Sequence, residues 1–259
     1  MSPRLSAPPP PDPWAGPLLP PGWRPDRETP PEDDRMHLKT HPVSRISCVF
    51  SDASDEQRWR VLDSDGHLGL GDGTEIALRP FRPGDGSLLV EGFARMSPRS
   101  RYRRFLSPMP QLTDSMLAFL TSVDGDNHRA WGALVDEPAG PVGAGVVRWV
   151  RTKDDPAVAD MAVTVIDDYQ GRGLGGLLLD VAVLDALSHG IERFEGLVLG
   201  ENISSRRMLA RGGATFRPDG GGVLAFTLPL RPRFDRLRGA SPLPALVANQ
   251  SRRARYGVF

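Results

Sequence analysis

Residues 163–176 read VTVIDDYQGRGLGG and are the most informative part of this sequence. A β-branched run ends in two acids, a glycine-rich turn follows, and an apolar stretch of helical period begins at Leu174. Glycines leave backbone N–H groups uncovered, so a phosphate can approach them closely at the positive end of the following helix. The stretch therefore predicts a phosphate-binding turn between a strand and a helix.

Two other interpretations of these glycines compete with that one. Gly171, Gly173 and Gly176 also match the spacing of the dinucleotide fingerprint. A dinucleotide fold usually opens its domain with this turn and enters it directly from an apolar strand. Here several strand-like segments precede the turn, residues 167–170 separate it from the strand, and too little chain follows for a doubly wound domain. The remaining alternative is a Gly/Arg loop without function.

The pattern Gln-x-x-Gly-x-Gly, from Gln170 to Gly175, resembles the pyrophosphate-binding signature of the GNAT superfamily of acyl-CoA-dependent N-acetyltransferases. The resemblance implies acetyl-CoA as cosubstrate, acyl transfer to an amine and no metal. It also implies cofactor contacts from a set of residues in the fourth strand, the glycine turn and a later helix: Val163, Val165, Gln170, Gly171, Arg172, Gly173, Leu174, Gly175, Asn202 and Ser205.

The composition excludes several classes of protein. The 259 residues carry no net formal charge, so no global field attracts the chain to nucleic acid or to a membrane. The single cysteine, Cys48, excludes a disulfide framework and a thiolate zinc cluster, and suits a reducing compartment. No apolar run approaches the ~20 residues that span a bilayer, and the N-terminus lacks the order of a signal peptide. A cytoplasmic protein is the simplest interpretation.

Proline and arginine set the two ends of the chain apart. Half of the 26 prolines fall within residues 1–42, and proline cannot join a strand ladder or a helix interior. We expect residues 1–45 to be a disordered tail and 46–73 a short strand-like extension. Residues 230–259 hold seven arginines against one acid, and we expect a flexible basic tail without specific nucleic-acid binding.

Between these ends, residues 74–229 show a regular alternation of patterns. The order of expected elements is β-α-α-β-β-β-α-β-α-β-β, which is the order of the GNAT fold. We therefore predict an α+β domain with a mixed, mostly antiparallel sheet flanked by helices. Expected strands cover 75–79, 129–136, 142–152, 158–166, 194–199, 214–216 and 223–228, and expected helices cover 85–95, 113–121, 174–187 and 202–211.

Three segments together resemble the Pat-type protein lysine acetyltransferases within this superfamily. They are Leu78-Arg79-Pro80 followed by Asp85, the basic segment SPRSRYRRF at 97–105, and DMAVTVIDD at 160–168. The resemblance implies a lysine ε-amine on a protein as the acceptor.

Acetyl transfer needs a base, because a lysine ammonium has a reference pKa of about 10.4. In the family a carboxylate on the fourth strand takes up the proton, and Asp160 occupies the matching position. The family usually has glutamate there. Aspartate is one methylene shorter, which favours a relay through water. The alternative is that Asp160 is an ordinary exposed acid at the start of a strand.

The resemblance also gives roles to the other site residues. Backbone groups of Val163 and Val165 are expected to pair with the pantetheine arm. Where two strands splay apart, a backbone N–H is left free, and this N–H is expected to polarise the thioester carbonyl. Arg172 is the natural phosphate partner, since its guanidinium can bond two oxygens at once. Asn202 either holds the cofactor arm or only caps a helix, and Ser205 is a weaker candidate.

One departure from the family leaves the proton donor unassigned. Many GNAT enzymes carry a tyrosine seven residues beyond the asparagine, where this chain has Leu209, so we expect water to protonate the CoA thiolate. Asp167 and Asp168 are expected to be solvated, with Asp168 capping the following helix. Arg99, Arg101, Arg103 and Arg104 form either a rim that binds acids beside a target lysine or a solvated face.

The sequence favours acetyl-CoA-dependent N-acetylation, with direct transfer to a protein lysine. A small-molecule amine acceptor is the nearest alternative, and a non-catalytic acyl-CoA-binding regulatory module is a second one. The acceptor, the acyl chain preference and the oligomeric state are left open by the sequence.

Overall fold

The computed structural model describes residues 59–61, 66–230 and 243–256. The expected disordered segment 1–45 and residues 46–58 of the expected strand-like extension, which include Cys48, lie outside these ranges.

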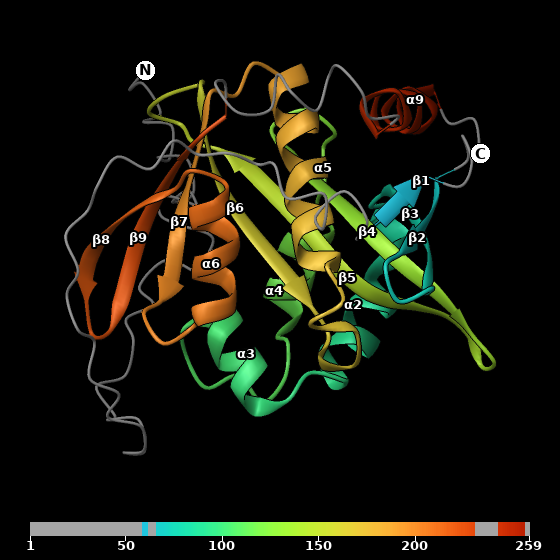
Figure 1. Cartoon of the computed structure of the whole chain (residues 1–259), viewed down its shortest axis with the longest axis horizontal. Coiled ribbons are helices and arrows are strands. Elements are labelled where there is room, and N and C mark those ends of the chain that lie inside the picture. Colours follow the sequence, from blue (N-terminus) through green and yellow to red (C-terminus); the bar gives the residue numbers. More distant parts are fainter. Residues whose placement is uncertain (1–58, 62–65, 231–242, 257–259) are drawn as a thin grey trace, which may run out of the picture.

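Nine strands form a single sheet in the order β1-β2-β3-β4-β5-β6-β7-β9-β8 (Figure 1). Every neighbouring pair is antiparallel except β6 and β7, which run parallel. This agrees with the mixed, mostly antiparallel sheet that the sequence predicts. The strands are β1 Trp59–Val61, β2 His67–Leu70, β3 Glu75–Pro80, β4 His128–Glu137, β5 Gly140–Arg151, β6 Val158–Val165, β7 Arg193–Leu199, β8 Thr215–Gly220 and β9 Val223–Pro229.

Helices cover both faces of the sheet. In Figure 1, α5 and α6 lie in front of the strands, and α2 and α4 lie behind them. Residues of β5 point alternately to these two layers: Trp149 Nε1 donates to Asp185 on α5 (2.9 Å), and Arg148 Nη2 donates to the Leu120 carbonyl of α4 (3.0 Å). The helices are η1 Pro83–Asp85, α2 Gly86–Ala94, α3 Pro98–Phe105, α4 Asp114–Thr121, η2 Asp167–Tyr169, α5 Leu174–Ser188, α6 Ile203–Arg211 and α9 Leu243–Tyr256.

The sheet opens between β6 and β7. These strands pair over only three residues each, Val158–Asp160 with Arg193–Glu195, although β6 continues to Val165 and β7 to Leu199. Because Ile166 donates its N–H to Ala144, the antiparallel alternation turns the N–H and C=O groups of Val163 and Val165 away from β5. Those backbone groups therefore face the opening.

Three elements differ from the sequence prediction. β1 and β2 lie within the expected strand-like extension 46–73, but β2 pairs with β3, so both strands continue the main sheet. The basic segment 97–105 forms helix α3, with the Ser97 hydroxyl accepting from the Ser100 N–H (3.2 Å) and Pro98 at the first helical position.

The third difference is at the C-terminal end. The prediction of a flexible tail over 230–259 is wrong for residues 243–256, which form helix α9 against α5. Leu243, Leu246 and Val247 are buried there, and their i, i+3, i+4 spacing is that of one apolar helix face. The Ser251 hydroxyl also donates to Asp185 (3.3 Å). Apolar burial therefore outweighs the basic composition of this segment.

Candidate active site

The glycine turn presents a row of backbone donors at the start of α5. Gly171 and Gly173 have φ angles of +77° and +90°, which disfavour residues other than glycine. Within the described part of the chain, no acceptor bonds the N–H groups of residues 171–175. These donors stand at the positive end of a 15-residue helix, so the turn is suited to an anion such as a pyrophosphate.

Gln170 holds this turn in place through its side chain. Its Nε2 donates to the Val165 carbonyl (3.0 Å) and to the Ser100 hydroxyl (3.2 Å). The residue that we expect to contact the cofactor thus also ties the turn to the end of β6 and to α3. Ser97 and Ser100 were missed as parts of this site because their partners lie about 70 residues away in the sequence.

Both acids before the turn have partners in the protein, and Asp168 is also solvated as the sequence predicts, with 56% of its side chain exposed. Asp167 accepts from the N–H and hydroxyl of Ser97 and from the hydroxyl of Ser100, at 2.8–3.0 Å. Burial opposes its charge, but these hydrogen bonds hold the pKa of Asp167 below its usual value. Asp168 pairs with Arg95 (2.5 Å) and does not cap α5, whose N-cap residue is Gly173. Both acids therefore attach the turn to the neighbouring helices.

Arg172 already has partners in the turn between β2 and β3. Its Nη1 lies 3.2 Å from both Asp72 Oδ2 and Thr74 Oγ1, and its guanidinium stands 5.1 Å from the centre of the Tyr169 ring. The side chain is 39% exposed, so these are surface contacts that a phosphate can compete with. The Tyr169 hydroxyl donates to Glu137 (2.8 Å) and so has another role than proton donor.

Asp160 stands at the last paired position before the sheet opens. It is directly opposite Glu195 on β7, and no described side chain donates a hydrogen bond to its carboxylate. Burial, together with the charge of Glu195, raises the pKa of Asp160 to about 6. The Glu195 carboxylate is bound by Arg193 Nε (3.0 Å). Sequence reasoning missed Glu195, although an acid within the apolar run of β7 was a signal.

Asn202 and Ser205 lie at the start of α6. The Asn202 side-chain oxygen accepts the Ser205 N–H (3.3 Å), so it caps this helix. Leu209, at the position of the tyrosine in many relatives of the resembled superfamily, is buried and cannot donate a proton. Of the two roles expected for Asn202, the structure thus shows the helix cap.

A family model described as Acetyltransferase (GNAT) domain matches residues 75–215, more than half of the 259 residues. The chain belongs to the GNAT acetyltransferase family. GNAT enzymes are acetyl-CoA-dependent N-acetyltransferases, and the glycine turn and the open strand pair lie within the matched region.

Several relatives are similar to this GNAT protein. Acetyltransferase Pat from Mycolicibacterium smegmatis is 35% identical over 173 residues, which make up 63% of this chain and 51% of the relative. The crystal structure of the GNAT domain of S. lividans PAT aligns with a TM-score of 0.58 and 26% identity, covering 66% of this chain and 99% of that one. A cAMP-binding acyltransferase from Mycobacterium smegmatis aligns with a TM-score of 0.51 and 28% identity, covering 72% and 53%.

The chain spans about half the length of the curated relative named above. Among the described residues, none of the helices is long and apolar enough to cross a membrane. In the same ranges no group of three or more His, Cys, Asp or Glu residues is arranged to hold a metal ion.

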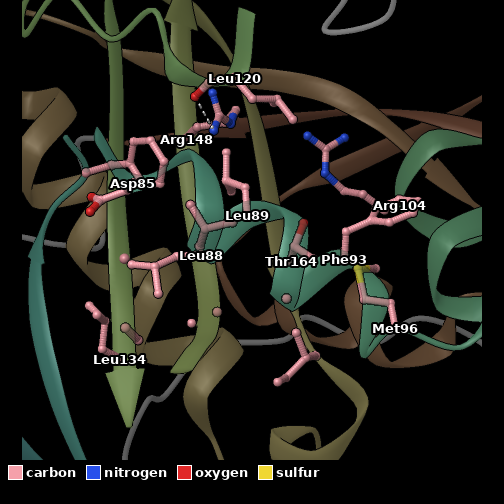
Figure 2. Close-up of a pocket in the computed structure, with 18 of the residues that line it drawn as sticks. Asp85, Leu88, Leu89, Phe93, Met96, Arg104, Leu120, Leu134, Arg148 and Thr164 are labelled. Atoms are coloured by element: carbon pink, nitrogen blue, oxygen red, sulfur yellow. Dashed lines mark hydrogen bonds between the residues drawn. The ribbon is translucent and has the colours of Figure 1, made fainter. Parts of the chain in front are cut away.

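The GNAT domain also encloses a cavity between the sheet and the helices α2, α3 and α4. It measures about 740 Å³ with its open mouth included. Thr164 of β6 and Ile166, the residue after this strand, line it, so the cavity adjoins the strand that carries Asp160. Figure 2 shows apolar side chains around most of this space, with Arg104 and Arg148 directed toward it.

The four arginines around Tyr102 do not form a continuous rim. Arg101 donates to the carbonyls of Ala94, Met96 and Pro110 and packs over Phe93. Arg104 lines the cavity. Arg99 and Arg103 approach Glu201 at 3.9 and 3.8 Å, and their side chains are 69% and 25% exposed. A substrate rim therefore has at most these last two residues from the cluster.

Proposed function

We propose that this protein transfers an acetyl group from acetyl-CoA directly to a lysine ε-amine on a protein. The observation that carries the proposal is the position of Asp160: a half-buried carboxyl beside the opening of the sheet, with its pKa raised to about 6. The protein acceptor is supported by the three segments that resemble Pat-type enzymes. Two of them, 97–105 and 160–168, are joined by the hydrogen bonds of Asp167 to Ser97 and Ser100.

The residues present fit acetyl-CoA. The free N–H groups of residues 171–175 would bind the pyrophosphate, with Gln170 keeping the turn in shape. Arg172 would leave Asp72 to reach a phosphate oxygen. The backbone groups of Val163 and the N–H of Val165 would pair with the pantetheine arm in the opening between β6 and β7, since the Val165 carbonyl already accepts from Gln170. Leu174 and Gly175 contribute the first turn of α5. Ser205 and the side-chain amide donors of Asn202 would border the arm.

Asp160 would act as the base. A carboxylate of raised pKa holds a proton more readily than an ordinary aspartate and is still mostly ionised at pH 7. It would take a proton from the lysine ammonium through a water, because the aspartate side chain is short. The neutral amine then attacks the thioester carbon, the N–C bond forms and the C–S bond breaks. Backbone N–H groups in the opening would stabilise the oxyanion, and the second proton that the amine nitrogen loses would pass through water to the departing CoA thiolate.

We expect direct transfer, because the only cysteine of the chain, Cys48, precedes the segment 74–229 to which we assign catalysis.

The test is to incubate the full chain with acetyl-CoA and a mixture of folded proteins and small amines, and to measure CoA release and acetylated lysine. Asp160→Asn is compared with Asp219→Asn, a surface acid of β8. We expect acetyl-lysine with the wild type and the control, and a loss of at least about 100-fold in rate with Asp160→Asn.

Acetylation of small amines alone would overturn the protein acceptor and leave the transferase. CoA binding without release on any amine would replace the enzyme by a CoA-binding module. Equal rates for Asp160→Asn and the wild type would remove Asp160 from catalysis.

A further inference from the structure

The cavity behind the sheet holds charges that its walls do not balance. Four charged residues line it: Arg79, Asp85, Arg104 and Arg148. Arg79 binds Asp85 with both ends of its guanidinium, Nη1 to Oδ2 at 2.6 Å and Nη2 to Oδ1 at 2.8 Å. This pair is satisfied within itself, so Arg104 and Arg148 are left as two cations facing an apolar space.

Arg148 is 2% exposed, and its partners carry no negative charge. Its Nη2 donates to the Leu120 carbonyl and its Nη1 lies 2.8 Å from His128 Nε2. Burial and the charge of Arg148 lower the pKa of His128 to about 4, so this imidazole is a neutral acceptor. Two of the five donors of Arg148 are therefore used, and its charge is not compensated.

Arg104 comes from α3 and is freer still. It makes no hydrogen bond or ion pair with any residue in the ranges that the structure describes, and its guanidinium lies 4.9 Å from the centre of the adjacent Phe105 ring. Burial lowers the pKa of Arg104 to about 10, and burial together with the charge of Arg104 lowers the pKa of Arg148 to about 9. The two guanidinium groups are thus close enough to repel each other.

Two unpaired cations beside apolar walls are costly, and an anion between them removes both the desolvation cost and the repulsion. We propose that this cavity binds a carboxylate carried on a short aliphatic arm of a substrate, with Arg104 and Arg148 holding the carboxylate. A planar carboxylate matches the guanidinium fork, and the arm would lie against apolar side chains of α2 such as Leu88, Leu89 and Phe93 (Figure 2).

The cavity is placed to receive part of the reacting molecules. Arg148 is directly opposite Ala162 on β6, and Val146 is opposite Thr164, so Asp160, Ala162 and Thr164 share the face of the sheet that the cavity adjoins. The carboxylate therefore comes either from the far end of an acyl chain or from the amine acceptor. Its role in transfer rests on the proposed function, whereas its binding does not.

Binding is tested without catalysis. Glutarate is titrated into the full chain, followed by NMR chemical shifts and calorimetry, with the neutral diamide of glutarate as the matched probe. We expect glutarate and not the diamide to bind, and Arg104→Gln and Arg148→Met each to weaken binding by at least about tenfold. Arg99→Gln, on the exposed face of the same helix, is the control and should bind as the wild type does.

Arg104→Gln separates binding from a structural role, because Arg104 has no described hydrogen bond to lose. Circular dichroism and the melting temperature check that each variant folds. Glutarate binding that is absent, or unchanged in a folded Arg104→Gln, would overturn the proposal. Equal binding of the diamide would also overturn it.

Two series of substrates then distinguish the sources of the carboxylate. Acetyl-CoA is compared with succinyl-CoA and glutaryl-CoA on one amine, and 6-aminohexanoate is compared with 6-aminohexanamide as acceptors of acetyl groups. A preference for the charged member that disappears in Arg104→Gln identifies the source and supports the proposal. If glutarate binds but no acetyl group is transferred to any amine, the proposed function is overturned and the carboxylate site stands. If acetyl groups are transferred, but with no preference for the charged substrate and no binding of glutarate, the carboxylate site is overturned and the proposed function stands.

Discussion

At the scale of single residues, the chemistry depends on how the fold treats one carboxyl group. Asp160 is half-buried and directly opposite Glu195, and both conditions disfavour its charge. The free-energy cost of ionising Asp160 falls at the position where the sheet opens, which is where an amine would approach the thioester. The raised pKa has separate consequences for rate and for stability.

The pH profile should show the ionisation of this residue. As a base, Asp160 works only when ionised, so kcat/KM should rise with pH through about 6 and lose this limb in Asp160→Asn. Asp160→Glu should keep a limb and part of the rate. Initial rates from pH 5 to 8 test this. If kcat/KM of Asp160→Asn still rises with pH near 6 as in the wild type, the rise comes from the ionisation of another group.

The same shift predicts a change in stability of opposite sense. The folded state binds the Asp160 proton more tightly than the unfolded chain, whose pKa is near 3.8, so ionisation costs stability as pH rises from about 4 through 6. Asp160→Asn should therefore raise the melting temperature at pH 8 and have little effect near pH 4. Thermal melts at the two pH values measure this difference. A lower melting temperature for the variant at pH 8 would contradict it.

At the scale of elements, the glycine turn is held by other parts of the chain. Asp167 and Gln170 bind α3, Asp168 binds Arg95, and Arg172 reaches Asp72 in the turn between β2 and β3. Attachments of this kind rigidify a phosphate-binding turn before the ligand arrives. Arg172 alone has to exchange one partner for another.

That exchange can be measured. Arg172→Gln should raise KM for acetyl-CoA by about tenfold with little change in kcat, because a charge-assisted phosphate contact is lost. Asp72→Asn should lower KM by up to about fivefold, since an exposed ion pair is worth at most about 1 kcal/mol. Steady-state kinetics at low and high salt test both variants. Unchanged KM values in Arg172→Gln would mean that the residue only joins two turns.

The helices and strands also show which features of the fold could be predicted from the sequence. The glycine turn and the order of strands and helices depend on neighbouring residues, and the sequence predicts them. The pairing of Asp160 with Glu195 and of Asp167 with Ser97 depends on residues brought together by folding. The acid within the apolar run of β7 marks Glu195 in the sequence, but no local pattern indicates either partner. In α9 the arginines concealed the spacing of Leu243, Leu246 and Val247.

At the scale of the whole molecule, α9 completes the packing around α5. The carboxylate of Asp185 is fully buried and bound by Arg129 at 2.6 and 2.7 Å, by Trp149 Nε1 and by Ser251 from α9. The pair has hydrogen bonds on both partners, which a buried ion pair requires. The helix beyond the matched region thus belongs to the folded core.

Leu246→Ala should lower stability by about 2 kcal/mol, and the melting temperature by about 2–4 °C for each kcal/mol, while kcat changes little. Val90→Ala, a deletion at a valine that is 47% exposed, is the control and should have little effect. Thermal melts with parallel rate measurements decide this. Equal melting temperatures for the two variants would show that α9 adds nothing to the core.

The opening between β6 and β7 has a consequence for hydrogen–deuterium exchange. In most sheets the amide hydrogens exchange slowest in the central strands, because those strands are paired on both sides. Here the amides of Val163 and Val165 lie in a central strand but are unpaired on the side of β7. They should exchange as fast as those of an edge strand in the free protein, and slow down when CoA is added.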